Sequence, residues 1–209
     1  MNTIIIITFI ICNLFLSCAE SNEKLLSELK TANAQYIRGE SGKSLATLSE
    51  IEKHDPDFTP ALFLSGKIHF MQGNYQAARE KWEKILRKKP HHINTGKWLI
   101  RLCILEENHE YADKLLMQFL EISPEDPDLL FLGGRLKKSE KKYLEAIEFY
   151  EKGFLFEDRL IEAHIDMAEI FSMFGIREKA VMHLEKAAFT GGEKHELYIP
   201  VKSLIKSME

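Results

Sequence analysis

The sequence repeats every 34 residues, which is the spacing between Pro56 and Pro90. Five consecutive copies fit this period without an insertion or a deletion. A third proline, Pro124, continues the same series. Small residues follow the same interval at Ser44, Ala78, Ala112, Ala146 and Ala180. A repeat of this length is one unit of local structure, and it buries its apolar face only against its neighbours. The repeat therefore predicts an array of stacked units that share one continuous core.

Each unit contains two amphipathic stretches on either side of a short turn. In the second unit, apolar and small residues recur every three or four positions at Leu62, Phe63, Gly66 and Phe70, and then at Ala77, Ala78, Trp82, Ile85 and Leu86. This spacing predicts two helices, and Gly73 followed by Asn74 predicts a tight turn between them. Glycine also stands at the corresponding position in two other units, as Gly39 and Gly175. The units are therefore helical hairpins at residues 25–58, 59–92, 93–126, 127–160 and 161–194.

Several residues are suited to begin these helices. Thr59 and Asp126 each precede a proline, and proline is favoured at the first helical position. Ser41, Asn74 and Asn108 precede second helices and have side chains that accept hydrogen bonds from a helix start. We expect all five residues to act as N-caps.

A second series of small residues, at Ala32, Gly66, Gly134 and Ala168, marks where the two helices of a hairpin approach each other most closely. Ile100 is the large exception in this series. A large side chain follows in the second helix of every unit, at Leu48, Trp82, Leu116, Tyr150 and Leu184, and is expected to fill the space between units. This pattern of small, large and proline positions resembles the tetratricopeptide repeat family over residues 25–194.

The resemblance implies an all-α fold, a right-handed α-solenoid of five helical hairpins. Residues 195–209 do not repeat, and their apolar side chains predict a capping helix over the last hairpin. A terminal cap of this kind covers the apolar end face that a repeat array would otherwise expose. Ile100 departs from the family pattern, so the packing of the third unit is expected to differ in detail.

Residues 1–17 contain no charged side chain. Their apolar run, residues 4–16, has the length of a signal-peptide core and is shorter than the roughly 20 residues of a membrane span. The run ends at Phe15-Leu16-Ser17-Cys18, which resembles the lipobox of bacterial lipoproteins. That resemblance implies that residues 1–17 are removed, that Cys18 carries the lipid, and that residues 18–24 form a short tether. It also implies a bacterial cell envelope location, at the outer membrane or a periplasmic face.

Two departures from the lipoprotein pattern leave alternatives open. No Lys or Arg follows Met1, and Phe15 replaces the leucine usual at that place. An ordinary cleaved signal or an uncleaved anchor would also produce this segment. Beyond Cys12 and Cys18 the chain has one further cysteine, Cys103, which falls on the inward side of a first helix. A single cysteine forms no internal disulfide, so Cys103 is expected to be a buried free thiol.

Composition and motifs argue against nucleic-acid binding and catalysis. The net charge of −4 is unlike that of a general nucleic-acid binder, which would be strongly basic. We find no glycine-rich phosphate loop, paired-cysteine motif, HExxH motif or nucleophile elbow. The adjacent His91 and His92 have no carboxylate or cysteine at a ligand spacing, so a solvated turn is expected there rather than a metal site. We therefore expect no enzyme activity, no cofactor and no metal.

The family resemblance places the first helices along a concave groove. Transferred position by position, the groove residues are Asn33, Phe63, Lys67, Phe70, Asn94, Lys97, Arg101, Phe131, Arg135 and Lys138, and the fifth unit adds the acidic Glu162 and Glu169. Cations beside aromatic rings suit a polypeptide that is acidic and carries apolar anchors. The alternative is that these are ordinary exposed residues whose apolar stems cover the helices. The carboxylate clamp known in the family is disfavoured, because Leu29 and Leu64 occupy two of its positions.

The predicted function is that of a non-catalytic, membrane-tethered adaptor that binds a protein or peptide partner in the concave groove. An envelope assembly or secretion complex is the setting that the lipoprotein resemblance implies. Two other functions remain open, a self-associating structural lipoprotein that forms homo-oligomers and a binder of an anionic polymer.

Overall fold

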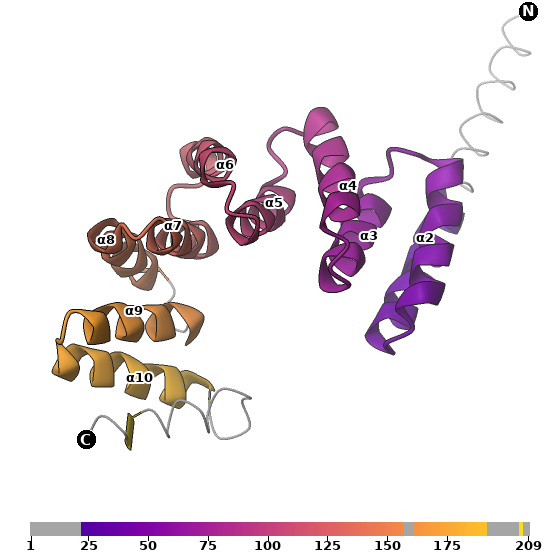
Figure 1. Ribbon diagram of the computed structural model, residues 1–209. Coiled ribbons are helices and arrows are strands. Elements are labelled where there is room, and N and C mark those ends of the chain that lie inside the picture. The colour runs from indigo at the N-terminus through magenta and orange to yellow at the C-terminus, as the bar shows by residue number, and fades with distance from the viewer. Residues whose placement is uncertain (1–21, 157–160, 192–204, 207–209) are drawn as a thin grey trace, which may run out of the picture. The chain divides into compact units, whose positions relative to one another are not determined.

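The computed structural model describes residues 22–156, 161–191 and 205–206, and the chain divides into two compact units after Pro90. The described part of the first unit contains a helix over residues 22–37, α2 (Ser41–His54), α3 (Thr59–Met71) and α4 (Tyr75–Lys88). The second unit contains α5 (Ile93–Leu105), α6 (His109–Ile122), α7 (Pro127–Ser139), α8 (Tyr143–Phe154), α9 (Ile161–Met173) and α10 (Arg177–Gly191). Figure 1 shows these helices with no strand among the described residues.

Consecutive helices pack as antiparallel hairpins, α3 with α4, α5 with α6, α7 with α8 and α9 with α10. In the second unit the first helices of successive hairpins also contact one another, α5 with α7 and α7 with α9. This arrangement confirms the predicted all-α helical-repeat solenoid fold. It also places side chains from α5, α7 and α9 next to one another, although these helices are separated by a full repeat in the sequence.

The turn inside each hairpin has the same backbone conformation in all five repeats. A positive φ occurs at the equivalent residues Gly39 (78°), Gly73 (77°), Glu107 (57°), Lys141 (60°) and Gly175 (70°). The next amide donates to the carbonyl five residues earlier, as in Asn108 N to Cys103 O at 2.9 Å, which is a Schellman helix end. Glycine was expected at three of these turns; Glu107 and Lys141 hold the same left-handed conformation without it.

Two glycines of the small-residue series lie directly beneath aromatic rings of their own hairpins. A Cβ atom added at Gly66 would lie 2.3 Å from Nε1 of Trp82, and one added at Gly134 would lie 2.3 Å from Cε1 of Tyr150. The close helix approach predicted at these positions is therefore confirmed. The large side chains were expected between units, but these two rings also fill the space within the hairpin.

Two of the five expected N-caps form. The Asp126 carboxylate accepts from the amide of Leu129 at 3.1 Å, and Asn108 accepts from the amide of Tyr111 at 3.3 Å. Asn74 stands at the N-cap position of α4 but its side chain makes no capping hydrogen bond. The predictions for Thr59 and Ser41 are wrong, since both are already the first helical residue and Phe58 and Glu40 precede them.

One cap was not foreseen from the sequence. His92 stands at the N-cap position of α5, and its Nδ1 accepts a hydrogen bond from the Thr95 amide at 3.3 Å. The Thr95 hydroxyl also lies 2.8 Å from the same nitrogen. A histidine is an unusual cap, and its role here agrees with the expectation that the His91-His92 pair belongs to a helix junction.

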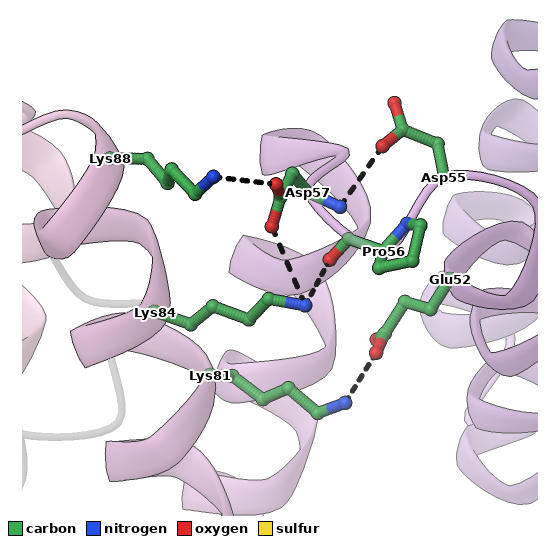
Figure 2. A network of polar contacts seen from close by, with 7 residues as sticks. All are labelled: Glu52, Asp55, Pro56, Asp57, Lys81, Lys84 and Lys88. Atoms are coloured by element: carbon green, nitrogen blue, oxygen red, sulfur yellow. Dashed lines mark hydrogen bonds and ion pairs between the residues drawn. The ribbon is translucent and has the colours of Figure 1, made fainter.

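Ion pairs in the first unit join α4 to the end of α2 and the loop after it (Figure 2). Lys81 pairs with Glu52, while Lys84 and Lys88 reach the Asp57 carboxylate at 3.6 and 3.1 Å. The hydrogen bond from Lys88 lowers the pKa of Asp57 below its ordinary value. Asp57 is exposed, so these contacts orient the loop more than they add to stability.

Several predictions fall on residues outside the described part of the chain. These are the signal segment at residues 1–17, Cys18, and most of the capping helix at residues 195–209. Ile205 is described, and it is buried against Ala168, Leu184 and Ala188 of the last hairpin. Among the described residues, none of the helices combines the length and the apolar character of a membrane span. Cys103 is buried, as expected, and forms no disulfide among the described residues.

Candidate functional site

Lys97 joins the first helices of the third and fourth repeats. Its ammonium group on α5 lies 2.7 Å from Oδ2 of Asp126 and 2.9 Å from Oδ2 of Asp128, at the start of α7. The Lys97 side chain is only 12% exposed, so this contact is shielded from solvent. Since Asp126 also caps α7 through its other oxygen, one carboxylate both begins a helix and anchors the preceding repeat.

Lys138 makes the corresponding connection between the fourth and fifth repeats. Its ammonium group on α7 lies 2.6 Å from Oδ1 of Asp166 on α9 and also pairs with Glu169. Burial opposes the charge, but the hydrogen bonds to these two carboxylates raise the pKa of Lys138 above its ordinary value. The Tyr150 hydroxyl donates to the other oxygen of Asp166 at 2.7 Å. Both oxygens of Asp166 are therefore engaged.

Arg101 and Arg135 differ from these lysines because neither forms an ion pair with a carboxylate among the described residues. The Arg101 guanidinium lies over the Trp98 ring, 5.3 Å from its centroid, and that of Arg135 lies over Phe131 at 5.7 Å. Burial is the main cause that lowers the pKa of Arg101; the charge of Arg135 also lowers it, against an opposing effect of Asp128. A guanidinium remains charged at neutral pH despite such a shift.

We use the name charged face for nine charged groups of α5, α7 and α9 and the Asp126 cap; Lys137 of α7 is not included, because it pairs with Asp113 of α6. It consists of Lys97, Arg101, Asp126, Asp128, Arg135, Lys138, Glu162, Asp166 and Glu169. Four cations thus stand among five carboxylates, and the face as a whole is not basic. The unpaired guanidiniums of Arg101 and Arg135 are the cations left to bind an anion.

The structure brings together the four predicted cations of the second unit and places the other two predicted residues of that unit differently. Asn94 is exposed near the start of α5. Phe131 is only 7% exposed, because its ring packs against Tyr150 with the centroids 6.0 Å apart. The Phe131 ring therefore supports Arg135 from the core, and little of its own surface is offered to a ligand.

The remaining predicted residues belong to the first unit. Asn33 is exposed on the helix over residues 22–37, and Phe63 and Lys67 are half-buried on α3. The Phe70 ring packs near Tyr75 and Trp82, at centroid distances of 5.6 and 5.9 Å. Phe70 thus contributes mainly to the packing of its own hairpin.

Sequence reasoning included Glu169 in the groove but missed Asp128, Asp166 and Trp98. Asp128 stands at the same repeat position as Asn94, so the position-by-position transfer could have found it. Asp166 and Trp98 stand one position beyond a predicted groove position, where the transfer gave no signal. Pairing of the lysines with these carboxylates depends on contacts between repeats, which a single sequence does not display.

Other polar features lie away from the charged face. A surface hollow at the α3–α4 turn is lined by residues that include His69, Tyr75 and Glu80, and none of the predicted site residues lines it. In the last hairpin, Nδ1 of His164 lies 2.9 Å from Nδ1 of His183, with both rings buried. The described residues contain no cluster of three or more His, Cys, Asp or Glu side chains placed to hold a metal ion.

Comparison with known proteins agrees with this architecture. Residues 60–92 match the family model described as tetratricopeptide repeat. Anaphase-promoting complex subunit 3 of Schizosaccharomyces pombe is 21% identical over 177 residues, which make up 85% of this chain and 27% of that protein. The chain therefore spans about a quarter of the length of this curated relative.

Solved structures with a similar fold include PilF of Pseudomonas aeruginosa, with a TM-score of 0.74, 15% identity and 90% of each chain covered. Another is a thermophilic tetratricopeptide repeat protein of Thermus thermophilus, with a TM-score of 0.72, 15% identity, and 88% of this chain and 98% of that chain covered. A third is MamA of Desulfovibrio magneticus RS-1, with a TM-score of 0.68, 18% identity, and 80% of this chain and 94% of that chain covered. At these identities the likeness shows the fold alone.

The repeated helical hairpins give the chain the fold of tetratricopeptide repeat proteins, and residues 60–92 match the model of that family. Proteins of this class are generally scaffolds for protein–protein interaction and are typically non-catalytic.

Proposed function

We propose that the chain is a non-catalytic, membrane-tethered adaptor that binds a polypeptide along the groove formed by its first helices. The observation that carries this proposal is the pair of unpaired guanidiniums, Arg101 and Arg135, on adjacent first helices. Lys97 and Lys138 are held by carboxylates of the next repeat, so the two arginines are the part of the charged face available to a partner. The packed helices beneath them fix their position, which lowers the cost of ordering on binding.

The lipobox resemblance at Cys18 supports the proposed tethering, and a bacterial envelope membrane is the location proposed with it. The setting we propose is an envelope assembly or secretion complex. One relative named above, anaphase-promoting complex subunit 3, is a component of a multi-subunit assembly, as an adaptor of this kind would be.

A crosslinking pull-down from native membranes tests the proposal. The Arg101→Glu/Arg135→Glu variant should lose the polypeptide that the wild-type protein captures, while its helical content by circular dichroism stays unchanged. Lys114→Glu on α6 is the matched control, because it reverses an exposed charge away from the charged face. If the Arg101→Glu/Arg135→Glu variant captures the polypeptide as well as the Lys114→Glu control does, the groove is not the binding surface.

Membrane tethering is tested separately in the same cells. The Cys18→Ala variant should leave the membrane fraction and lose the mass of the attached lipid. Membrane retention of this variant would favour an uncleaved anchor, and tethering through Cys18 would then be wrong.

Self-association is a second candidate, and a set of exposed apolar side chains favours it. The last residue of the first helix is a strongly exposed apolar side chain in four of the five repeats, Ile37 (82%), Met71 (60%), Leu105 (52%) and Met173 (61%). Exposed apolar side chains that recur in this way are typical of interaction surfaces. Light scattering across a concentration series would then show dimers of the wild-type protein, and the Leu105→Glu and Met173→Glu variants would remain monomeric. A constant monomer mass of the wild-type protein would exclude this candidate.

An anionic polymer is a poorer ligand for the charged face than a polypeptide. Continuous polyanion binding needs a run of available cations, and two of the four cations here are already held by carboxylates.

A further inference from the structure

Two neighbouring hairpin turns carry opposite charges at the same repeat position, Glu107 in the third repeat and Lys141 in the fourth. We propose that a second copy of this chain binds at the turn edge, which we define as the tips of these two turns, residues 105–110 and 139–144. In this dimer Glu107 of each protomer pairs with Lys141 of the other. The inference goes beyond the groove adaptor and shares no residue with the charged face. It rests on the self-association candidate, for which it names the surface and the pairing.

Glu107 and Lys141 stand at their turns in a backbone conformation that favours glycine. Their φ angles are 57° and 60°, and glycine holds the equivalent place in three other repeats. A residue that carries a Cβ atom is less stable than glycine in this left-handed conformation. Both side chains are exposed, so neither offsets this cost by packing in the core. Strain retained in this way is typical of residues that take part in binding.

The two tips are held side by side within the second unit. The Ser139 hydroxyl, at the end of α7, lies 3.1 Å from Nε2 of His109, the first residue of α6. Lys137 of α7 also pairs with Asp113 of α6 at 2.6 Å. These contacts fix the spacing of the two tips, so a partner meets a preorganised surface.

The tip of the third turn is acidic. Glu106, Glu107 and Glu110 are exposed there, and residues 105–110 include no lysine or arginine. The Glu107 side chain forms no ion pair with any described residue. This tip therefore attracts a cation of a partner.

The tip of the fourth turn presents a cation. Lys141 is exposed and likewise has no ion-pair partner within the described part of the chain. The neighbouring carboxylate, Glu140, is already engaged by Lys137 at 3.3 Å and by Lys142 at 3.2 Å. Glu145 stands on the first turn of α8, where the helix dipole stabilises a negative charge. The charge that this tip offers to a partner is therefore that of Lys141.

A second copy of the chain supplies both halves of this pattern. A two-fold axis across the repeat direction reverses the order of the repeats in the partner, so each third turn faces the partner's fourth turn. The contact then forms twice, and each time it joins opposite charges. The same arrangement covers Leu105 and Leu144, whose side chains are 52% and 73% exposed. Charge complementarity thus favours the chain itself over an unrelated partner, which would need the reverse pattern at the same spacing.

Sedimentation velocity of the full chain in detergent, over a range of protein concentrations, tests this dimer. The variants are Glu107→Lys and Lys141→Glu, each alone and the two mixed in equal amounts. Glu121→Lys and Lys152→Glu are the matched controls, because they reverse exposed charges near the opposite ends of α6 and α8. Circular dichroism checks that every variant is folded.

We expect the wild-type protein to dimerise and each single reversal to weaken dimerisation at least tenfold, while the two controls leave it unchanged. The mixture of the two reversed proteins should dimerise again, since opposite charges then meet at both contacts. Dimerisation of the wild-type protein should also weaken as salt is raised. The Glu107→Gly/Lys141→Gly variant, which relieves the backbone strain and keeps the fold, should weaken dimerisation as well.

Three other results would overturn the inference. A wild-type protein that stays monomeric at every concentration contradicts the self-association candidate and this dimer together, and leaves the groove adaptor standing. A dimer that persists in both single reversals shows that the chain associates through another surface. A mixture of the two reversed proteins that stays monomeric shows that Glu107 and Lys141 do not face each other. Either of the last two results contradicts the pairing while self-association stands.

Discussion

The ring of Phe119 occupies the space directly above Gly96, so that a Cβ atom added to the glycine would lie 2.0 Å from Cε2 of the ring. In the second repeat, Trp82 lies in the same way above Gly66. In the third repeat this contact lies one helical turn away along each helix. The reason is that Ile100 stands at the position of Gly66, and Leu116 stands at the position of Trp82. The hairpin keeps one small-to-large contact at a different place.

This relationship predicts that Gly96→Ala destabilises the protein. The ring of Phe119 is fully buried and would have to move, and overfilling a packed core costs about 1–3 kcal/mol. The double variant Gly96→Ala/Phe119→Leu should recover part of that loss, because the smaller side chain leaves room for the methyl group. Thermal unfolding followed by circular dichroism measures both effects.

Gly42→Ala is the matched control for this substitution. Gly42 lies within α2 with no heavy atom within 4 Å of an added Cβ atom, so alanine should raise stability there by about 0.5–1 kcal/mol. An equal effect of alanine at Gly42 and Gly96 would contradict the packing explanation.

The turns at Glu107 and Lys141 predict stabilising substitutions. Both residues hold a positive φ, which costs a side-chain-bearing residue about 1 kcal/mol relative to glycine. Glu107→Gly and Lys141→Gly should each raise the unfolding free energy by up to about that amount, and Gly73→Ala should lower it similarly. Chemical denaturation gives the values. A loss of stability in both glycine variants would show that the side chains at these turns matter more than the backbone conformation.

Much of the fold could be predicted from the sequence because the same pattern of apolar, small and turn residues recurs in five repeats. The hairpins, the close approach at Gly66 and Gly134, and the caps at Asp126 and Asn108 follow from local spacing and residue type. The start of α3 was misplaced because Phe58 enters the helix with an extended backbone, which residue preferences at Thr59 do not reveal. The contact between Gly96 and Phe119 could not be predicted, because it depends on which residue of the facing helix lies opposite the glycine.

Asp126 has two roles that substitution should separate. Asp126→Ala removes both the cap of α7 and the ion pair with Lys97, whereas Asp126→Asn keeps a capping oxygen and removes the charge. The alanine variant should lose about 1 kcal/mol for the cap alone and more in total than the asparagine variant. Asn108→Ala, a cap without this ion pair, provides the value for capping by itself. Equal losses for Asp126→Ala and Asp126→Asn would mean that the cap contributes nothing.

Tyr150 predicts a loss of stability in alkaline solution. Burial, with the nearby Asp166 carboxylate, raises the pKa of Tyr150 well above its ordinary value of 10.0. Above pH 10 the unfolded chain releases this proton and the folded chain keeps it, so stability falls as pH rises, and the contribution is fully present below pH 10. Tyr150→Phe should show a shallower decline in melting temperature between about pH 9.5 and 11. The same slope in both proteins would contradict this.

The candidate site was less predictable than the fold. The four cations of the second unit were identified correctly as neighbours, because repeat position determines which face of a first helix a residue occupies. Which of these cations is available to a ligand was not predictable, because Lys97 and Lys138 form ion pairs with carboxylates of the following repeat. Phe131 was assigned to the groove by position, yet its ring is drawn into the core by Tyr150.

The balance of cations and carboxylates on the charged face also bears on how quickly a partner is captured. Fast, diffusion-driven capture requires a field of one sign that reaches beyond the contact surface, and here opposite charges cancel within a few ångströms of each other. Encounter should therefore proceed at the unassisted rate of about 10⁵–10⁶ M⁻¹s⁻¹, with little response to ionic strength. Residence time, rather than speed of arrival, would then distinguish the right polypeptide from the wrong one.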